Sequence, residues 1–173
     1  NNVAKWNGND WVAMGFGLKS GAGAGDTVQD VVMGNDFIGG DDTNYADDTV
    51  YALGAFEGTC QTLACTGVGA GAQGIAEDSQ AASLWRPMGD GSMAGYGFAG
   101  AYIDDTLYIG GNFTSVSGRS AQSIAQWGNA DDTWIALGGG MSNGSLVYAM
   151  AVHPVTRDRY IGGYALQPHG YSN

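Results

Sequence analysis

Paired aspartates are the side chains in this sequence that are best suited to bind an ion. The tripeptide Asp-Asp-Thr occurs four times, and its carboxylates belong to Asp41, Asp42, Asp47, Asp48, Asp104, Asp105, Asp131 and Asp132. Clustered carboxylate oxygens are typical ligands of hard cations, so these pairs are candidate calcium ligands. The same tripeptide also favours a β-turn in which its side chains bond to the nearby backbone. Because a turn explains the recurrence without a metal ion, we expect turns and keep calcium as the alternative.

Residues for catalysis are sparse. The histidines are His153, within the turn-like sequence VHPVTRD, and His169. No H-E-x-x-H zinc motif occurs. The segment 21–26 (GAGAGD) imitates a phosphate-binding loop but lacks the lysine of such loops, which favours a linker. We therefore predict a protein that is not an enzyme, with no catalytic residue, no cofactor and no transition metal.

Three short motifs are typical of secreted proteins. Cys60 and Cys65 lie in CQTLAC, with no histidine or further cysteine nearby to complete a zinc site. We predict a disulfide between them, which would indicate an oxidising compartment, and two buried free thiols are the alternative. Asn112 in NFT and Asn143 in NGS match the N-glycosylation acceptor pattern. We expect an extracellular or cell-surface protein.

Composition and charge narrow the range of partners. Lys and Arg number 6, and the net charge is −11 at pH 7. Binding to nucleic acid or to anionic lipid depends on cationic side chains, so we expect neither partner. No run approaches the roughly 20 apolar residues that span a bilayer, so membrane insertion is not expected. The first residues, NNVAKWNG, carry neither an initiating Met nor a signal-peptide pattern, which suggests a processed chain or part of a longer one.

The elements that must position these residues repeat along the chain. Four segments ending in glycine mark the period: residues 11–15 (WVAMG), 50–54 (VYALG), 85–89 (WRPMG) and 134–138 (WIALG). Their mean spacing of about 43 residues is that of propeller blades. Between them lie short runs rich in Val, Ile, Tyr, Trp and small residues, separated by turn signals. We predict one all-β domain over residues 1–173, a β-propeller with four blades of about four antiparallel strands.

Individual residues refine this prediction. The sequence IGG ends the segments 36–40, 107–111 and 159–163, and its double glycine predicts a bulge or a close contact between blades. Pro87 predicts an edge strand, because proline cannot donate to a sheet ladder. All five Trp fall at equivalent or nearly equivalent positions, so we expect them in the core. The second repeat lacks most of its third strand, and the third repeat lacks IGG.

The repeat resembles kelch-type repeats, in which a double glycine, two later aromatics and a final Met or Leu recur. The matching residues are Gly110, Gly111, Trp127, Trp134 and Met141. The segment 3–18 is also similar to repeats of large secreted bacterial β-propeller proteins that carry I-A-x-W-[ND]-G-x-x-W-x-x-[LM]-G. The resemblance implies a propeller fold and says little of function. Kelch-type propellers usually have six or seven blades, so four repeats depart from the family.

The two ends of the sequence make one repeat when they are joined. The complete repeat has sixteen residues from Asn112 to Trp127, and the segments 164–173 and 1–6 together have the same length. We therefore expect the N- and C-terminal strands to close the last blade together within one molecule, which stacks with its copies. Strand exchange between neighbouring molecules and one long polypeptide of such units are the alternatives.

Two functions remain open at this stage. The first is a non-enzymatic extracellular structural protein, a propeller unit repeated with copies of itself in a fibre, surface layer or tandem array. The alternative is an adhesin-type module that binds a glycan or a protein. Tyr45, Tyr96 and Tyr171 break the repeat and are candidate aromatics of a binding face. Their clustering beside a cleft would favour binding.

Overall fold

The computed structural model describes residues 2–19, 26–34, 49–60, 71–79, 84–128 and 132–170. Within these ranges the chain is all-β, as expected, and its one helical element is a short 3-10 turn. The elements are β1 (Ala4–Trp6), β2 (Trp11–Ala13), β3 (Leu18–Lys19), β4 (Thr27–Gly34), β5 (Thr49–Ala55), β6 (Gly58–Thr59), β7 (Ile75–Ser79), β8 (Leu84–Pro87), β9 (Met93–Ile103), β10 (Thr106–Val116), β11 (Arg119–Ser120), β12 (Ile124–Gly128), β13 (Thr133–Ala136), η1 (Leu137–Gly139), β14 (Leu146–Val152) and β15 (Arg159–Tyr164).

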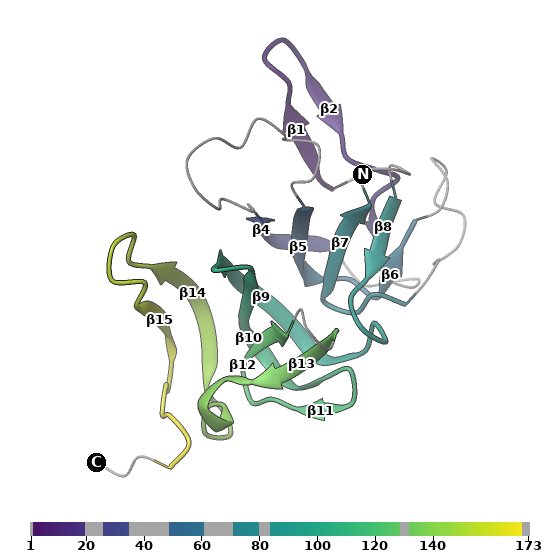
Figure 1. The fold of residues 1–173 in the computed structure, drawn as a ribbon. Coiled ribbons are helices and arrows are strands. Elements are labelled where there is room, and N and C mark those ends of the chain that lie inside the picture. The colour runs from purple at the N-terminus through teal and green to yellow at the C-terminus, as the bar shows by residue number, and fades with distance from the viewer. Residues whose placement is uncertain are drawn as a thin grey trace.

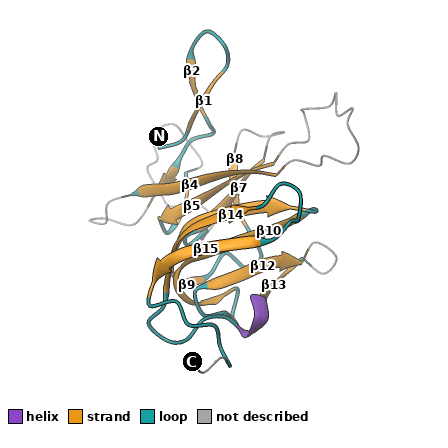
Figure 2. Cartoon of the chain, turned by 90° about the vertical axis from the view of Figure 1, so that its left-hand side faces the viewer, coloured by secondary structure: helices purple, strands orange, loops and turns teal. Residues whose placement is uncertain are grey.

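The strands form several antiparallel sheets that follow one another in space (Figures 1 and 2). Sheet I has the order β4-β5-β7-β8, and sheet II has the order β9-β10-β12-β13 with the short β11 beside β10. The N-terminal hairpin β1–β2 and the C-terminal hairpin β14–β15 are two-stranded sheets, and β3 pairs with β6. Strand β9 packs between β4 and β14, so sheet II lies between sheet I and the C-terminal hairpin.

Sheet I, sheet II and the C-terminal hairpin share one bulge. In each, the first and second strands shift register and leave one residue unopposed: Gln29, Phe98 or Tyr148. Next to the shift, the second strand carries Gly54, Gly111 or Gly163. A Cβ at any of these glycines would collide with a carbonyl oxygen of the first strand. The bulge predicted from IGG is therefore confirmed at Gly111 and Gly163.

The shared bulge corrects the repeat assignment. The segment 50–54 lies in β5, the second strand of sheet I, whereas 85–89 and 134–138 begin in β8 and β13, the fourth strands. The four segments therefore do not mark one position, and the assignment at 50–54 was wrong. The second repeat was expected to lack most of its third strand. This strand is present as β7, in the same sheet as β5. Two complete repeats remain, in sheet I and sheet II.

Two Asp-Asp-Thr sequences lead into strands at different positions of a sheet. Asp104 and Asp105, with φ of 48° and 55°, form the turn between β9 and β10, which leads into a second strand. Asp132, with φ of 48°, precedes β13, a fourth strand. Asp-Asp-Thr thus marks a turn and not the place of the next strand in its sheet.

The ends of the described chain are not joined. The N-terminal hairpin projects at one end of the molecule and the C-terminal hairpin lies beyond sheet II (Figure 1). The expected last blade, shared by the N- and C-terminal strands, is therefore not formed within this structure. Pro87 does lie in an edge strand, β8, as predicted.

Neighbouring sheets pack through side chains that enter glycine-lined gaps. Leu53 of sheet I is fully buried and packs against Gly97 and Gly100 of β9, where a Cβ would lie 2.7 and 2.9 Å from its methyl groups. Val147 of the C-terminal hairpin packs in the same way against Gly110 of β10. The close contact between repeats that the double glycine predicted is thus present. Each fully buried aliphatic side chain contributes about 1.5–3 kcal/mol to folding.

The bulge glycine generates a stability prediction. We expect Gly111→Ala to lower the free energy of unfolding by about 1–3 kcal/mol, because the new methyl group meets the rigid Tyr96 carbonyl. Gly71→Ala is the matched control, since a Cβ there meets nothing within 4 Å, and its effect should stay within about 1 kcal/mol. Urea unfolding measures both. Equal stability of the two variants would contradict the account of the bulge.

Candidate functional site

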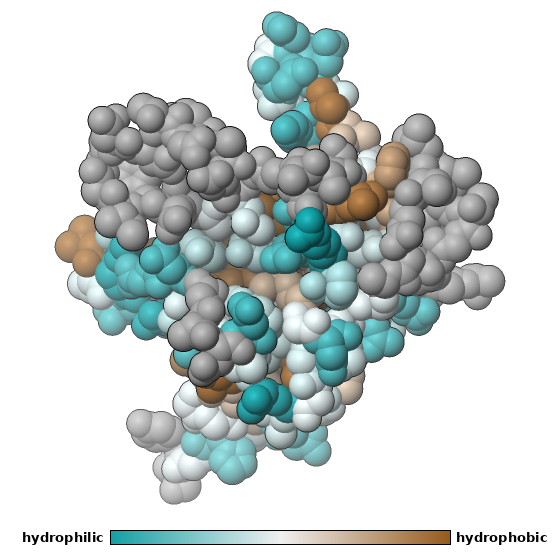
Figure 3. Space-filling model, turned by 45° about the vertical axis from the view of Figure 1, so that its right-hand side comes forward, coloured by the Kyte–Doolittle hydropathy of each residue, from teal (hydrophilic) through white to brown (hydrophobic). Residues whose placement is uncertain are grey.

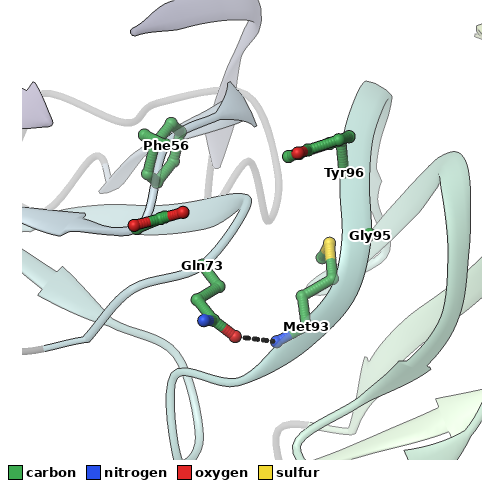
Figure 4. Close-up of a pocket in the computed structure, with 6 residues that line it drawn as sticks. Phe56, Gln73, Met93, Gly95 and Tyr96 are labelled. Carbon is green, nitrogen blue, oxygen red and sulfur yellow. Dashed lines mark hydrogen bonds between the residues drawn. The ribbon is translucent and has the colours of Figure 1, made fainter. Parts of the chain in front are cut away.

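A pocket of about 180 Å³ opens between sheet I and sheet II (Figure 4). Its lining consists of Phe56, Glu57, Gln73, Met93, Gly95 and Tyr96. The first three residues come from the segments that follow β5 and precede β7, and the last three come from the start of β9. The pocket is therefore made by the junction of two repeats and not by one sheet alone.

The base of the pocket is apolar and is held by hydrogen bonds of Gln73. Phe56 and Met93 are 1% and 4% exposed. The Gln73 side-chain oxygen accepts a hydrogen bond from the Met93 backbone N–H at 3.3 Å, and the Gln73 backbone N–H donates to the Gly91 carbonyl at 2.8 Å. These bonds join the two sides of the pocket, so its shape is set before any ligand arrives.

Tyr96 forms the exposed wall. Its side chain projects across the pocket opposite Phe56 (Figure 4) and is 47% exposed. The preceding residue, Gly95, has a φ of +133°, and a Cβ there would collide with the Asn112 carbonyl. Glycine is therefore required at this point, and the local backbone directs Tyr96 toward the pocket.

The arrangement suits binding more than reaction. An aromatic ring can stack on the apolar face of a ligand, while the Glu57 carboxylate and the Gln73 amide can bond to its hydroxyl groups. No group of three or more His, Cys, Asp or Glu that could hold a metal ion occurs among the described residues. A sugar or a short polar peptide matches this mixture of an apolar face and hydrogen-bonding groups.

The described aspartate pairs form turns. The Thr106 hydroxyl donates to the Asp104 carbonyl at 3.2 Å, and the Asp104 carboxylate pairs with Arg157 at 2.8 Å. Both charged side chains are about half exposed, so the ion pair contributes little to stability. Asp41, Asp42, Asp47, Asp48 and Asp131 lie outside the described residues. The turn interpretation holds for the described pair, and calcium binding stays a prediction.

The other predicted site residues are scattered. Tyr96 lines the pocket, whereas Tyr45 and Tyr171 lie outside the described residues, so the expected clustering of the three aromatics is not tested. Asn112 on β10 and Asn143 in a turn before β14 are both exposed, as an acceptor of glycosylation must be.

Cysteine and histidine predictions have different outcomes. Cys60 is buried, with 3% exposure, but Cys65 lies outside the described residues, so the disulfide stays a prediction. His153 lies in the turn between β14 and β15, as expected, and its Nδ1 accepts hydrogen bonds from the backbone N–H groups of Val155 and Thr156.

One motif went unnoticed in the sequence. Residues 140–144 (GMSNG) match the G-x-S-x-G pattern of hydrolase nucleophiles. That motif requires a strand followed by a helix, but here the segment runs from η1 through a turn into β14. The backbone N–H of Ser142 donates to the Gln167 carbonyl at 2.7 Å, which makes the segment part of the link to the chain after β15. The context of a hydrolase nucleophile is thus absent from this segment.

The pocket residues other than Tyr96 were also missed. Phe56, Glu57, Gln73 and Met93 come from segments separated by up to 37 positions. The available signal was Phe56 itself, since Ala55–Phe56 follows Gly54 as Asn112–Phe113 follows Gly111. That equivalence was hidden by the incorrect assignment of 50–54.

The tryptophans do not all lie in the core. Trp85 and Trp134 are 3% and 0% exposed, whereas Trp6 and Trp11 are 54% and 72% exposed. The expectation of five core residues was therefore wrong for the N-terminal pair. The reason is packing: among the described residues no further strand pairs with this hairpin, while the equivalent pair on β12 and β13 belongs to a complete sheet. In both pairs the rings contact each other, with centroids 5.6 Å apart in the hairpin and 5.1 Å apart in sheet II.

Burial shifts the pKa values of titratable groups beside the junction of sheets I and II. Desolvation raises the pKa of Tyr51 to about 12, with further increases from Tyr102 and Glu77. Burial also raises the pKa of the Glu77 carboxyl, against the effect of nearby Arg86. At the surface, hydrogen bonds from Ser92 lower the pKa of Asp90. The junction therefore disfavours negative charge on Tyr51 and Glu77.

The chain has no significant match to any protein-family model, curated protein or solved structure. Among the described residues, no helix is long and apolar enough to span a membrane.

The raised pKa of Tyr51 generates a pH prediction. The folded protein holds this phenol neutral, while the unfolded chain releases its proton near pH 10. The contribution to stability is complete below pH 10 and is lost as the pH rises toward 12, by roughly 2–3 kcal/mol. We expect Tyr51→Phe to show a shallower loss of stability over this range than Tyr164→Phe, the exposed control. Denaturant titrations at several pH values measure it, and identical slopes would contradict the prediction.

Proposed function

We propose that this protein is a non-enzymatic extracellular structural protein, built from β-propeller blades and repeated with copies of itself in a larger assembly. The supporting observation is the equivalence of its parts. Sheets I and II have the same strand order and the same registers between second, third and fourth strands. A chain whose successive sheets are interchangeable in this way is suited to extension by further repeats.

The blade interpretation rests on how the sheets stack. Each repeat forms a four-stranded antiparallel sheet, and each sheet contacts the next through its face. This is the arrangement of propeller blades. The four blades inferred from sequence are not confirmed. On the blade interpretation, sheets I and II correspond to two complete blades, β1–β2 to the outer half of one and β14–β15 to the inner half of one.

Charge and surface motifs support an extracellular assembly. A net charge of −11 with few Lys and Arg limits adhesion to nucleic acid. The exposed asparagines of both glycosylation motifs and the cysteine pair of CQTLAC are typical of secreted chains. No observation of the pocket calls for catalysis.

Fractionation of the native source tests this function. We expect the chain outside the cell or on its surface, in particles much larger than the 17.8 kDa of one copy. An antibody to the chain, used on size-separated extracellular and intracellular fractions, measures this. Recovery solely inside the cell, as a single copy, would contradict the proposal.

The pocket favours a second function, glycan binding, for which Tyr96 and Glu57 supply the contacts. A glycan array identifies the ligand, and calorimetry then measures its affinity. We expect Tyr96→Ala to weaken binding at least about tenfold, because the stacking wall is lost. Tyr164→Ala, which removes a 64% exposed ring outside the pocket, is the control and should leave the affinity unchanged. Absence of any glycan ligand, or equal affinity of the two variants, would exclude this function.

A further inference from the structure

We propose that β15 of one copy pairs with β1 of a second copy as adjacent strands of one sheet, and that two copies close into one ring of six sheets. This inference rests on the proposed structural function and names the partner and the contact. It follows from three observations. The two hairpins are complementary halves of a sheet, the two complete sheets share one register, and the tryptophan pair of the N-terminal hairpin is exposed.

The two hairpins are complementary halves of the same sheet. The C-terminal hairpin has the bulge that sheets I and II form between their first and second strands. The N-terminal hairpin pairs Trp6 with Trp11 and Ala4 with Ala13, as the third and fourth strands of sheet II pair Trp127 with Trp134 and Ala125 with Ala136. The free edge of β15 is therefore the edge that a third strand occupies in sheets I and II, and β1 is a third strand.

The two complete sheets fix the register of this contact. Their second and third strands pair at three equivalent positions: Tyr51 with Glu77, Ala52 with Ala76 and Leu53 with Ile75 in sheet I, and Tyr108 with Gln126, Ile109 with Ala125 and Gly110 with Ile124 in sheet II. Transferred to the hairpins, the same register pairs Tyr160 with Lys5, Ile161 with Ala4 and Gly162 with Val3.

A flanking backbone bond supports the same register. In sheet I the N–H of Gly54 donates to the Gly74 carbonyl, and in sheet II the N–H of Gly111 donates to the Ser123 carbonyl, both at 3.1 Å. The corresponding donor in the C-terminal hairpin is Gly163, and the corresponding acceptor is Asn2. The register shared by sheets I and II thus predicts each residue pair of the contact between β15 and β1.

The exposed tryptophans identify a second surface that the contact covers. The indole N–H of Trp85 donates to the Met14 carbonyl at 3.1 Å, across the junction between sheet I and the N-terminal hairpin. Trp134 lies on the fourth strand of sheet II at the position equivalent to Trp85 and is fully buried. Trp11 occupies the equivalent position in the N-terminal hairpin and is 72% exposed. Figure 3 shows hydrophobic atoms exposed at the base of this projecting hairpin. In the ring, Trp11 packs against the end of β13 in the second copy.

The number of sheets indicates that two copies are needed to close the ring. The part of one copy that the structure describes supplies sheet I, sheet II and two halves, which equal three sheets. Propellers have about four to eight blades, so three are too few for one copy to close on itself. The hairpins also lie apart, with complete sheets between them (Figure 1). The described residues of two copies supply six sheets, the two pairings of β15 with β1 cover the inner edges of the hairpins, and the two junctions are equivalent under a twofold axis.

Two proline variants test the contact. The Met14 N–H donates to the Val3 carbonyl, so the next residue, Ala4, directs its N–H to the free edge of β1. Ala4→Pro removes that donor at both junctions, which predicts a dimer dissociation constant about 100-fold higher. Ala13→Pro is the matched control, because Pro87 naturally occupies the equivalent position in sheet I.

Light scattering on the purified chain measures the masses. We expect the unchanged chain and Ala13→Pro at twice 17.8 kDa, and Ala4→Pro at 17.8 kDa with an unchanged circular dichroism spectrum. Fluorescence from Trp11 should shift to shorter wavelength in the dimer. A single copy at every concentration, or a dimer that Ala4→Pro leaves equally stable, would overturn the contact. The extracellular location of larger particles would still stand, so failure here is distinct from failure of the proposed function.

Engineered cysteines test the register. Lys5→Cys combined with Tyr160→Cys places two exposed residues opposite each other, within the roughly 4.4–6.8 Å between Cα atoms that a disulfide needs. Lys5→Cys combined with Tyr164→Cys is displaced by four residues, about 13 Å along the strand, and is the control. We expect mild oxidation to give a covalent dimer in the first variant alone. A crosslink within one copy, or equal crosslinking of both variants, would refute the register.

Discussion

The fold depends on the close approach of two backbones at the bulge between the first and second strands. At Gly54, Gly111 and Gly163 there is no room for a side chain, because a carbonyl oxygen of the first strand occupies the space. A bulge increases the twist of the strands that carry it. Since all three bulges lie at one position, the sheets twist alike, and the face of one can fit the next.

This common shape explains how the sheets pack. Leu53 and Val147 enter gaps lined by glycine, so neighbouring backbones come closer than two ordinary sheet faces would allow. One apolar cluster then joins sheet I to sheet II, and another joins the N-terminal hairpin to sheet I. The pocket beside Tyr96 is an opening between sheet I and sheet II, where segments of two repeats leave a space. The packing of repeats and the candidate binding site thus have one origin.

The sequence was informative where local chemistry decides the structure. Strand content, the bulge at Gly111, the edge position of Pro87 and the turn at His153 follow from residue preferences that act over a few positions. The place of β5 in its sheet does not, because the same Asp-Asp-Thr sequence leads into the second strand β10 and into the fourth strand β13. Only the pairing of β5 with both β4 and β7 decides between the two. The pocket was likewise beyond local reasoning, since Phe56 and Tyr96 meet only after two repeats have packed.

The division into interlocking sheets has a mechanical consequence. Within each complete sheet, backbone hydrogen bonds join all four strands, whereas contacts between sheets consist mostly of side-chain packing. Packing contacts act over a short range and are lost after a small displacement. A chain pulled from its ends would therefore part first between sheets, and each sheet would survive as a unit until its own ladder is broken. An assembly made of such chains would extend in steps of one repeat and could recover its length when the load is removed.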